Sequence, residues 1–98
     1  MRQNMFNRRM IRRHYIFEGD VQGVGFRWYA KQAASACGVT GWVRNEYDGS
    51  VTMELQGSAE QIDAALEMLK EDSWIRITRT TVREMEPDDA ERSFRVRY

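Results

Sequence analysis

The sequence predicts an α+β fold in which two helices cover one face of an antiparallel β-sheet. Three observations predict it. Apolar and polar side chains alternate in several short segments, apolar side chains recur every three or four residues in two longer ones, and turn or cap signals separate the segments. The 98 residues are enough for a single hydrophobic core, so we expect one domain.

The first strand and the first helix flank a glycine-bearing loop. Residues 13–18 alternate as a strand does, and one apolar face is formed by Tyr15 and Phe17. Residues 25–37 have helical periodicity, and one face of this helix is formed by Phe26, Tyr29, Ala30, Ala33 and Cys37. Gly38 follows, and glycine is the residue that most often ends a helix.

Two further strands form a predicted hairpin. Residues 40–47 make the first strand, and Asp48-Gly49 after it is a strong signal for a tight turn. In the second strand, polar residues alternate with the apolar residues Val51, Met53 and Leu55. That alternation is typical of a strand with one buried face and one solvated face.

The second helix and two last strands complete the order. Ser58 and Gln61 match a capping box, and the buried stripe behind them consists of Ile62, Ala65, Leu66 and Leu69. β-Branched residues in 75–85 indicate a fourth strand, and a short final strand alternates Phe94, Val96 and Tyr98 with polar residues. The order is β-α-β-β-α-β with a short extra C-terminal strand, the ferredoxin-like split sandwich with both helices on one face.

The charge balance excludes some functions. Fifteen basic and fifteen acidic side chains give a net charge of zero, which argues against a nucleic-acid partner. No apolar run approaches the about 20 residues that cross a membrane. Cys37 is the only cysteine, so no intramolecular disulfide forms. We expect a cytoplasmic monomer that binds neither nucleic acid nor a membrane.

The N-terminal segment is basic. Five arginines and no acidic residue fall in the first thirteen positions: Arg2, Arg8, Arg9, Arg12 and Arg13. Chain termini of this composition are commonly solvated and mobile. We therefore expect residues 1–12 to be a flexible basic extension and residues 13–98 to be the folded domain.

The loop between the first strand and the first helix is a candidate phosphate site. A helix N-terminus presents unpaired backbone N–H groups and a positive dipole end, and glycine lets a ligand approach the backbone closely. The predicted cradle consists of Asp20, Val21, Gln22, Gly23, Val24, Gly25 and Phe26. Arg27 adds a planar cation suited to a bidentate grip on phosphate, although a lone arginine at a helix start also commonly makes a surface ion pair.

Known nucleotide and metal sites do not fit this loop. It lacks the Gly-Lys-Ser/Thr ending of a nucleotide P-loop, and Trp28 stands where a dinucleotide fingerprint needs its third glycine. Histidine and cysteine occur once each, so no zinc cluster can be assembled from them. We expect neither a metal nor an organic cofactor.

Asn45 is the second candidate for chemistry. Alternation places it on the same face as Val43 and Gly41, and its amide can orient a water molecule there. It could equally satisfy backbone groups of the following turn, and the residues alone leave this open. A site with so few groups suits acyl-phosphate hydrolysis, because a carboxylate with a pKa of about 4 leaves without a general acid.

The two motifs together resemble the acylphosphatase family. The resemblance is carried by Gly19-Asp20-Val21-Gln22-Gly23-Val24-Gly25-Phe26-Arg27, by Gly38-Val39-Thr40-Gly41-Trp42-Val43-Arg44-Asn45 and by Asp48-Gly49-Ser50-Val51. It implies a ferredoxin-like fold and hydrolysis of small acyl phosphates. The family's catalytic arginine and asparagine fall on Arg27 and Asn45. Asp20 departs from the family pattern, which has a basic or small residue at this position.

A non-catalytic ferredoxin-like module is the alternative. It would bind an anion or a partner at the loop without turnover. RNA binding is disfavoured, because the strand around Met53 has no aromatic residue for base stacking. We expect three tryptophans to pack in the core or at its edge: Trp28, Trp42 and Trp74.

Overall fold

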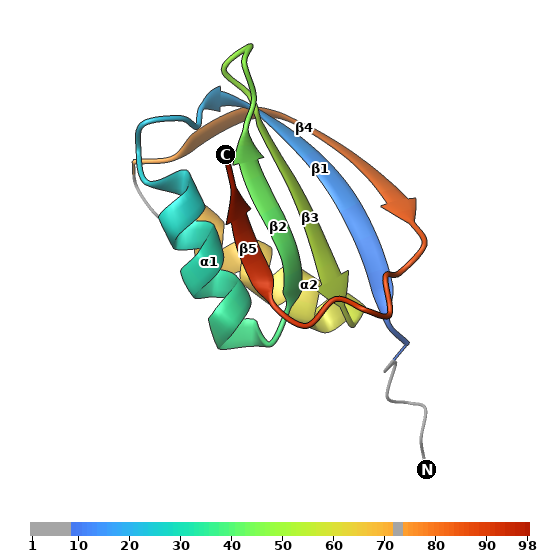
Figure 1. Ribbon diagram of the computed structural model, residues 1–98. Coiled ribbons are helices and arrows are strands. Elements are labelled where there is room, and N and C mark those ends of the chain that lie inside the picture. Colours follow the sequence, from blue (N-terminus) through green and yellow to red (C-terminus); the bar gives the residue numbers. More distant parts are fainter. Residues whose placement is uncertain (1–8, 72–73) are drawn as a thin grey trace.

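A five-stranded sheet carries two helices on one face (Figure 1). The computed structural model describes residues 9–71 and 74–98. The strands follow the spatial order β4-β1-β3-β2-β5. The elements are β1 (Ile11–Asp20), α1 (Phe26–Cys37), β2 (Thr40–Asn45), β3 (Val51–Gly57), α2 (Ala59–Lys70), β4 (Arg76–Met85) and β5 (Phe94–Arg97). The predicted ferredoxin-like order is confirmed.

The hydrophobic core lies between the helices and the sheet. The sheet contributes buried side chains at every second position, including Phe17, Val43 and Met53. The helices contribute their predicted stripes, of which Phe26 and Ile62 are almost fully buried. Alternation in the strands and helical spacing in the helices thus bring their apolar faces together in one layer.

Cap residues mark the end of α1 and the start of α2, as the sequence predicts. Gly38 adopts the left-handed conformation with φ 72° and its N–H donates to the carbonyl oxygen of Ala34. At α2, the Ser58 hydroxyl accepts from the Gln61 N–H, and the Gln61 side chain accepts from the Ser58 N–H. Both reciprocal bonds of the capping box are therefore present.

The direction of the last strand differs from the prediction of an antiparallel sheet. β5 pairs with β2 in parallel, with Val43 opposite Val96, whereas the other neighbouring strands are antiparallel. The chain leaves β4 at one edge of the sheet and crosses to the opposite edge before β5 begins (Figure 1). After this crossing the chain runs parallel to β2, and the sheet is therefore mixed.

One predicted boundary, at the start of the domain, and one predicted burial pattern, that of β3, are wrong. β1 begins at Ile11, and Arg12 is only 4% exposed, so these two residues belong to the folded domain and not to the extension 1–12. Residues 1–8 lie outside the described residues. β3 is buried along its whole length, since Arg12 and the segment between β4 and β5 cover the polar side chains of Glu54 and Gln56.

The tryptophans divide. Trp42 is buried, as predicted, but Trp28 and Trp74 are 61% and 72% exposed, so the prediction of packing is wrong for those two.

Cys37 is half-buried, and its thiol lies 3.7 Å from the sulfur of Met68. Within residues 9–71 and 74–98, none of the helices has the length and apolar character to span a membrane.

Candidate functional site

A cleft of about 710 Å³ lies where the β1–α1 loop, the end of β2 and β5 meet. The strand register explains the meeting of loop and β2. Asn45 at the end of β2 pairs with Val51 of β3, and Val51 pairs with Phe17 of β1, just before the loop. The cleft is lined by Val21, Gly23, Gly25, Phe26, Arg27, Trp28, Lys31, Asn45, Phe94, Arg95, Val96 and Tyr98.

The loop is held by contacts that leave the helix start open. Val21 is fully buried, and the Gln22 amide donates to the carbonyl oxygens of Glu46 at 2.7 Å and Ser50 at 2.8 Å. Gly25 precedes α1 with φ 84°, a conformation that other residues rarely adopt, and provides no side-chain cap. The first N–H groups of α1 therefore have no side-chain acceptor and can serve an anion.

The predicted cradle residues divide between two hollows. Val21, Gly23, Gly25 and Phe26 line the cleft. Three of the predicted residues, Asp20, Gln22 and Val24, instead line a separate hollow on the other side of the loop, together with Trp74 and Arg76. Because Asp20 does not line the cleft, its carboxylate does not oppose an anion there through direct contact.

Arg27 lies in the first turn of α1 and is half-buried. Its guanidinium carbon lies 5.0 Å from the ring centroid of Tyr98, a cation–π contact. Among the described residues it makes no ion pair and no hydrogen bond, so the surface ion pair considered from the sequence is not formed. Its donors are available to a phosphoryl group.

Asn45 has an unsatisfied amide. Its Oδ1 atom is buried and has no hydrogen-bond partner among the residues that the structure describes. An acceptor left in that state costs about 1–3 kcal/mol, which makes an orphaned amide uncommon without a functional reason. The sequence also allowed Asn45 to hydrogen-bond backbone groups of the following turn, and this oxygen does not do so.

The hairpin after Asn45 is held independently. Asp48 accepts from the Ser50 hydroxyl at 2.6 Å and from the Ser50 N–H at 3.0 Å. These hydrogen bonds lower the pKa of the Asp48 carboxyl, since they favour its charged form. The turn therefore closes through Asp48, and the Asn45 amide is left for another partner.

Six lining residues were not singled out as site residues by the sequence reasoning: Trp28, Lys31, Phe94, Arg95, Val96 and Tyr98. Lys31 follows Arg27 by four positions, so helical spacing could have placed both on one face. Arg95 and Tyr98 belong to the C-terminal strand region, and their proximity to α1 depends on the parallel pairing of β5 with β2. No local pattern reports that pairing.

Side chains for a metal do not gather in this cleft. Within residues 9–71 and 74–98, there is no group of three or more histidine, cysteine, aspartate or glutamate side chains placed to hold a metal ion. The charged residues that line the cleft are all basic in the part of the chain that the structure describes. The arrangement is suited to binding an anion directly.

Comparison with known proteins gives the family. A family model described as acylphosphatase matches residues 13–96. This chain belongs to the acylphosphatase family. An acylphosphatase from Bifidobacterium longum is 41% identical over 90 residues, which span 90% of this chain and 93% of the relative.

Solved acylphosphatase structures have the same fold. The crystal structure of an acylphosphatase from Bacillus subtilis matches with a TM-score of 0.82 at 28% identity, and the match covers 90% of this chain and 99% of that one. An acylphosphatase from Coxiella burnetii matches with a TM-score of 0.80 at 31% identity, covering 99% and 100% of the two chains.

Proposed function

We propose that this chain is an acylphosphatase, an enzyme that hydrolyses small acyl phosphates to a carboxylate and inorganic phosphate. One observation carries the proposal. In the part of the chain that the structure describes, a guanidinium without an anionic partner and an amide oxygen without a donor line the same cleft, beside a helix N-terminus that no side chain caps. A phosphoryl group and a water molecule would complete all three.

The loop and Arg27 bind the phosphoryl group in this proposal. Backbone N–H groups of the predicted cradle and of the first turn of α1 donate to its oxygens. The Arg27 guanidinium donates a bidentate pair of hydrogen bonds, which strengthen as charge moves onto the equatorial oxygens in the transition state. A rigid cradle costs no reorganisation when the reaction occurs.

Asn45 orients the attacking water. Its Oδ1 accepts a hydrogen bond from the water, so the water's own lone pair is free to attack phosphorus. The water forms a new P–O bond while the bond from phosphorus to the acyl oxygen breaks. The bonding pair of the broken bond leaves with the carboxylate.

Proton transfer needs no acidic or basic side chain of the cleft. The leaving carboxylate is stable at neutral pH, because a carboxylic acid has a pKa of about 4. Among the described residues, those that line the cleft include no aspartate, glutamate, histidine or cysteine. The water's proton therefore passes to an oxygen of the phosphoryl group itself, and no metal or organic cofactor takes part.

The site also agrees with a small substrate and a single chain. All groups named above come from one copy of the protein, so no partner is needed to complete them. The net charge of zero gives no general attraction to nucleic acid or to an anionic membrane. We propose that the protein acts as a monomer in the cytoplasm.

Release of inorganic phosphate from benzoyl phosphate in the presence of EDTA tests the function. The wild type is compared with Arg27→Gln and Asn45→Ala, and Arg83→Gln on the exposed part of β4 is the matched control. We expect turnover by the wild type and the control, and a loss of about 10²–10³ in kcat/KM for Arg27→Gln. Phosphate binding without turnover by folded wild type would favour the non-catalytic module.

A further inference from the structure

The two halves of the proposed site come from separate parts of the chain. Residues 21–25 form the loop between β1 and α1, whereas Asn45 is the last residue of β2, at the base of the hairpin that leads into β3. We propose that Gln22 is a positioning residue whose side-chain amide fixes the loop and the hairpin relative to each other. This inference rests on the proposed function and adds a residue whose side chain touches neither the phosphoryl group nor the water.

The Gln22 amide nitrogen uses both of its hydrogen atoms on the hairpin. It donates to the carbonyl oxygen of Glu46 at 2.7 Å and to that of Ser50 at 2.8 Å. Glu46 follows Asn45 directly, and Ser50 precedes Val51, which is the register partner of Asn45. Gln22 therefore holds the backbone of both strands of the hairpin immediately beside the Asn45 side chain.

The hairpin itself closes without this amide. The Glu46 N–H donates to the Ser50 carbonyl oxygen at 2.8 Å, and the Gly49 N–H donates to the Glu46 carbonyl oxygen at 3.2 Å. Each carbonyl oxygen that accepts from Gln22 thus has a second donor within the hairpin and would keep a partner if the amide were removed. The need to satisfy these two carbonyl groups therefore does not explain the contacts of Gln22.

The loop is also anchored to the core without this amide. Val21 is fully buried and Phe26 is 2% exposed, so apolar packing fixes the residues on either side of the glycines. Within residues 9–71 and 74–98, the hydrogen bonds that join the loop to the hairpin are the two that Gln22 donates. The amide is therefore a link between two units that are each held by other contacts.

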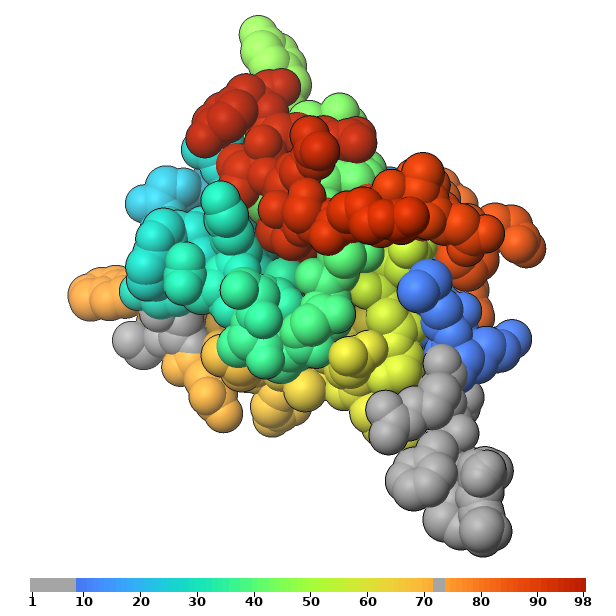
Figure 2. Space-filling view, turned by 60° about the horizontal axis from the view of Figure 1, so that its bottom comes forward, coloured from blue at the N-terminus to red at the C-terminus, as the bar shows by residue number. Residues whose placement is uncertain are grey.

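The hairpin needs such a link because its tip projects from the body of the domain (Figures 1 and 2). Residues 47–49 are exposed, so packing at the tip does not fix the direction in which the hairpin leaves the sheet. The attacking oxygen must lie about 3–3.5 Å from phosphorus with its orbital aligned, and a misplacement of about 1 Å can lower the rate about 10²-fold. By fixing the base of the hairpin, Gln22 keeps the Asn45 amide aligned with a phosphoryl group bound at the loop.

The test measures turnover and phosphate binding on the same variants. Gln22→Met keeps the length of the side chain and removes both donors, and Gln22→Glu keeps its shape and polarity but has no N–H group. Gln32→Met, at an exposed position of α1, is the matched control. For each variant, kcat and KM are measured with benzoyl phosphate, the inhibition constant is measured for inorganic phosphate, and urea unfolding shows that the variant is folded.

We expect kcat to decrease about ten- to a hundredfold in both Gln22 variants, because the water is no longer in line with the phosphoryl group. The inhibition constant for phosphate should change by less than about threefold, since the backbone of the loop and Arg27 still bind the anion. The control should behave as the wild type does. A role in loop structure alone would instead weaken phosphate binding together with turnover.

A double variant shows whether Gln22 acts through Asn45. If the amide serves to place the Asn45 side chain, its loss has no further effect once that side chain is gone. We therefore expect Asn45→Ala and the double variant Asn45→Ala with Gln22→Met to agree in kcat within about twofold. Losses that multiply in the double variant would overturn the inference.

The remaining outcomes separate the inference from the function on which it rests. An active wild type beside folded Gln22 variants with unchanged kcat overturns the positioning role and leaves the proposed function intact. The positioning role is also overturned if phosphate binding weakens as much as kcat falls, or if both Gln22 variants fail to fold. Folded wild type that does not hydrolyse benzoyl phosphate contradicts the proposed function and, with it, the role of Gln22.

Discussion

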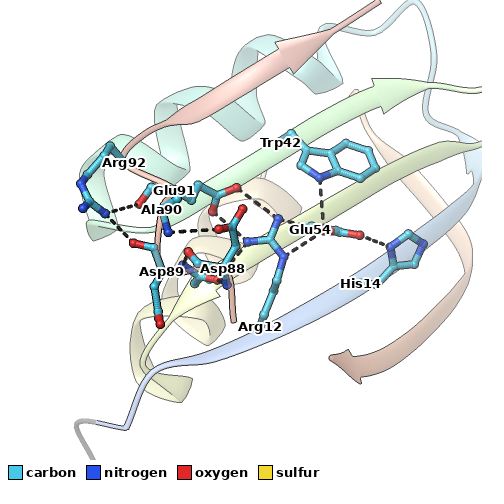
Figure 3. Close-up of polar contacts among 10 residues, drawn as sticks. Arg12, His14, Trp42, Glu54, Asp88, Asp89, Ala90, Glu91 and Arg92 are labelled. Carbon is cyan, nitrogen blue, oxygen red and sulfur yellow. Dashed lines mark hydrogen bonds and ion pairs between the residues drawn. The ribbon is translucent and has the colours of Figure 1, made fainter. Parts of the chain in front are cut away.

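Two regions of this protein hold charged and polar side chains in opposite ways. On the sheet face away from the helices, a buried cluster of Arg12, His14, Trp42, Glu54 and Glu91 satisfies its members internally (Figure 3). In the cleft beside the β1–α1 loop, Arg27 has no anionic partner and Asn45 Oδ1 has no donor among residues 9–71 and 74–98. We infer that the first region stabilises the fold and propose that the second binds a ligand.

The geometry of the buried cluster shows how complete it is. Arg12 donates from Nε to Glu54 at 2.9 Å and from its two terminal nitrogens to the Glu91 carboxylate at 2.9 and 3.1 Å. Glu54 also contacts His14 Nδ1 at 2.6 Å and accepts from Trp42 Nε1 at 3.2 Å. The cluster fastens the segment that crosses from β4 to β5, and so positions the strand that forms one wall of the cleft.

Polarity alone therefore does not mark a functional site. Buried polar groups that are fully paired contribute rigidity and a unique arrangement. Polar side chains that are held in place without a partner slightly lower the stability of the folded state. They form favourable interactions only when a ligand binds. Variants of the buried cluster should therefore change mainly the stability, and variants of the cleft should change mainly the activity.

The largest effect is expected at Arg27. Arg27→Gln should reduce kcat/KM for benzoyl phosphate by about 10²–10³, because in the proposed mechanism the guanidinium stabilises the transferring phosphoryl group. The free energy of unfolding should change by less than about 0.5 kcal/mol, since Arg27 interacts only with the exposed Tyr98 ring and forms no ion pair within the described chain. Urea unfolding measured beside the kinetics checks both. A large decrease in stability would place Arg27 among the structural residues instead.

Arg12→Met should give the reverse pattern. Removing the guanidinium leaves Glu54 and Glu91 buried without their partner, which typically costs about 3 kcal/mol. Activity per folded molecule should stay within about twofold of the wild type. The matched control is Arg79→Met, whose exposed ion pair with Glu18 at 3.7 Å should contribute nothing measurable. Equal stability of Arg12→Met and the control would contradict the assignment of the cluster.

Asn45→Ala tests the unsatisfied amide. Activity should decrease by about 10², because in the proposed mechanism the water loses its orientation for attack on phosphorus. Stability should not fall by more than about 1 kcal/mol, since the Oδ1 atom that is removed makes no hydrogen bond within the described chain. Thermal unfolding and phosphate release on the same preparation measure both. An unstable variant with normal activity per folded molecule would mean that the amide serves the hairpin.

The smallest effect concerns pH. Burial raises the pKa of the Glu54 carboxyl, but hydrogen bonds from His14 and Arg12 outweigh it, so the pKa lies below its ordinary value of 4.5. The folded state therefore gains stability from the charged carboxylate above about pH 4.5 and loses this gain as the pH falls below it.

A comparison with Glu54→Gln makes this measurable. The difference in unfolding free energy between the wild type and this variant should be largest near about pH 7 and should shrink as the pH falls below about 4.5. Glu67→Gln on the exposed face of α2 is the control and should show no such trend. If the difference in unfolding free energy stays constant from neutral to acidic pH, the charged carboxylate of Glu54 does not stabilise the fold.

Local patterns predicted much of this molecule. Helical spacing and the capping box identified α1 and α2, because those signals depend only on near neighbours. Alternation placed Asn45 on the core-facing side of β2, and the glycine loop identified Arg27. These two residues lie far apart in the sequence, and the register of three strands brings them together. The family resemblance implied that they meet, and the residues alone did not.

Other features depend on contacts that no local pattern contains. The parallel direction of β5 follows from a crossing over the whole end of the sheet. Arg12 sits in a basic segment that resembles a solvated arm, and its burial requires Glu54 and Glu91, which lie 42 and 79 residues away. The large apolar surface of Trp28 predicts burial, but the residue lies at the cleft and is exposed.

The central claim is that water held at Asn45 attacks phosphorus. Hydrolysis of benzoyl phosphate in ¹⁸O-labelled water, followed by mass spectrometry of both products, tests it most directly. The account predicts turnover with the label in inorganic phosphate, and the same label position at a much lower rate in Asn45→Ala. Label in benzoate would show attack at the carbonyl carbon and would contradict the mechanism.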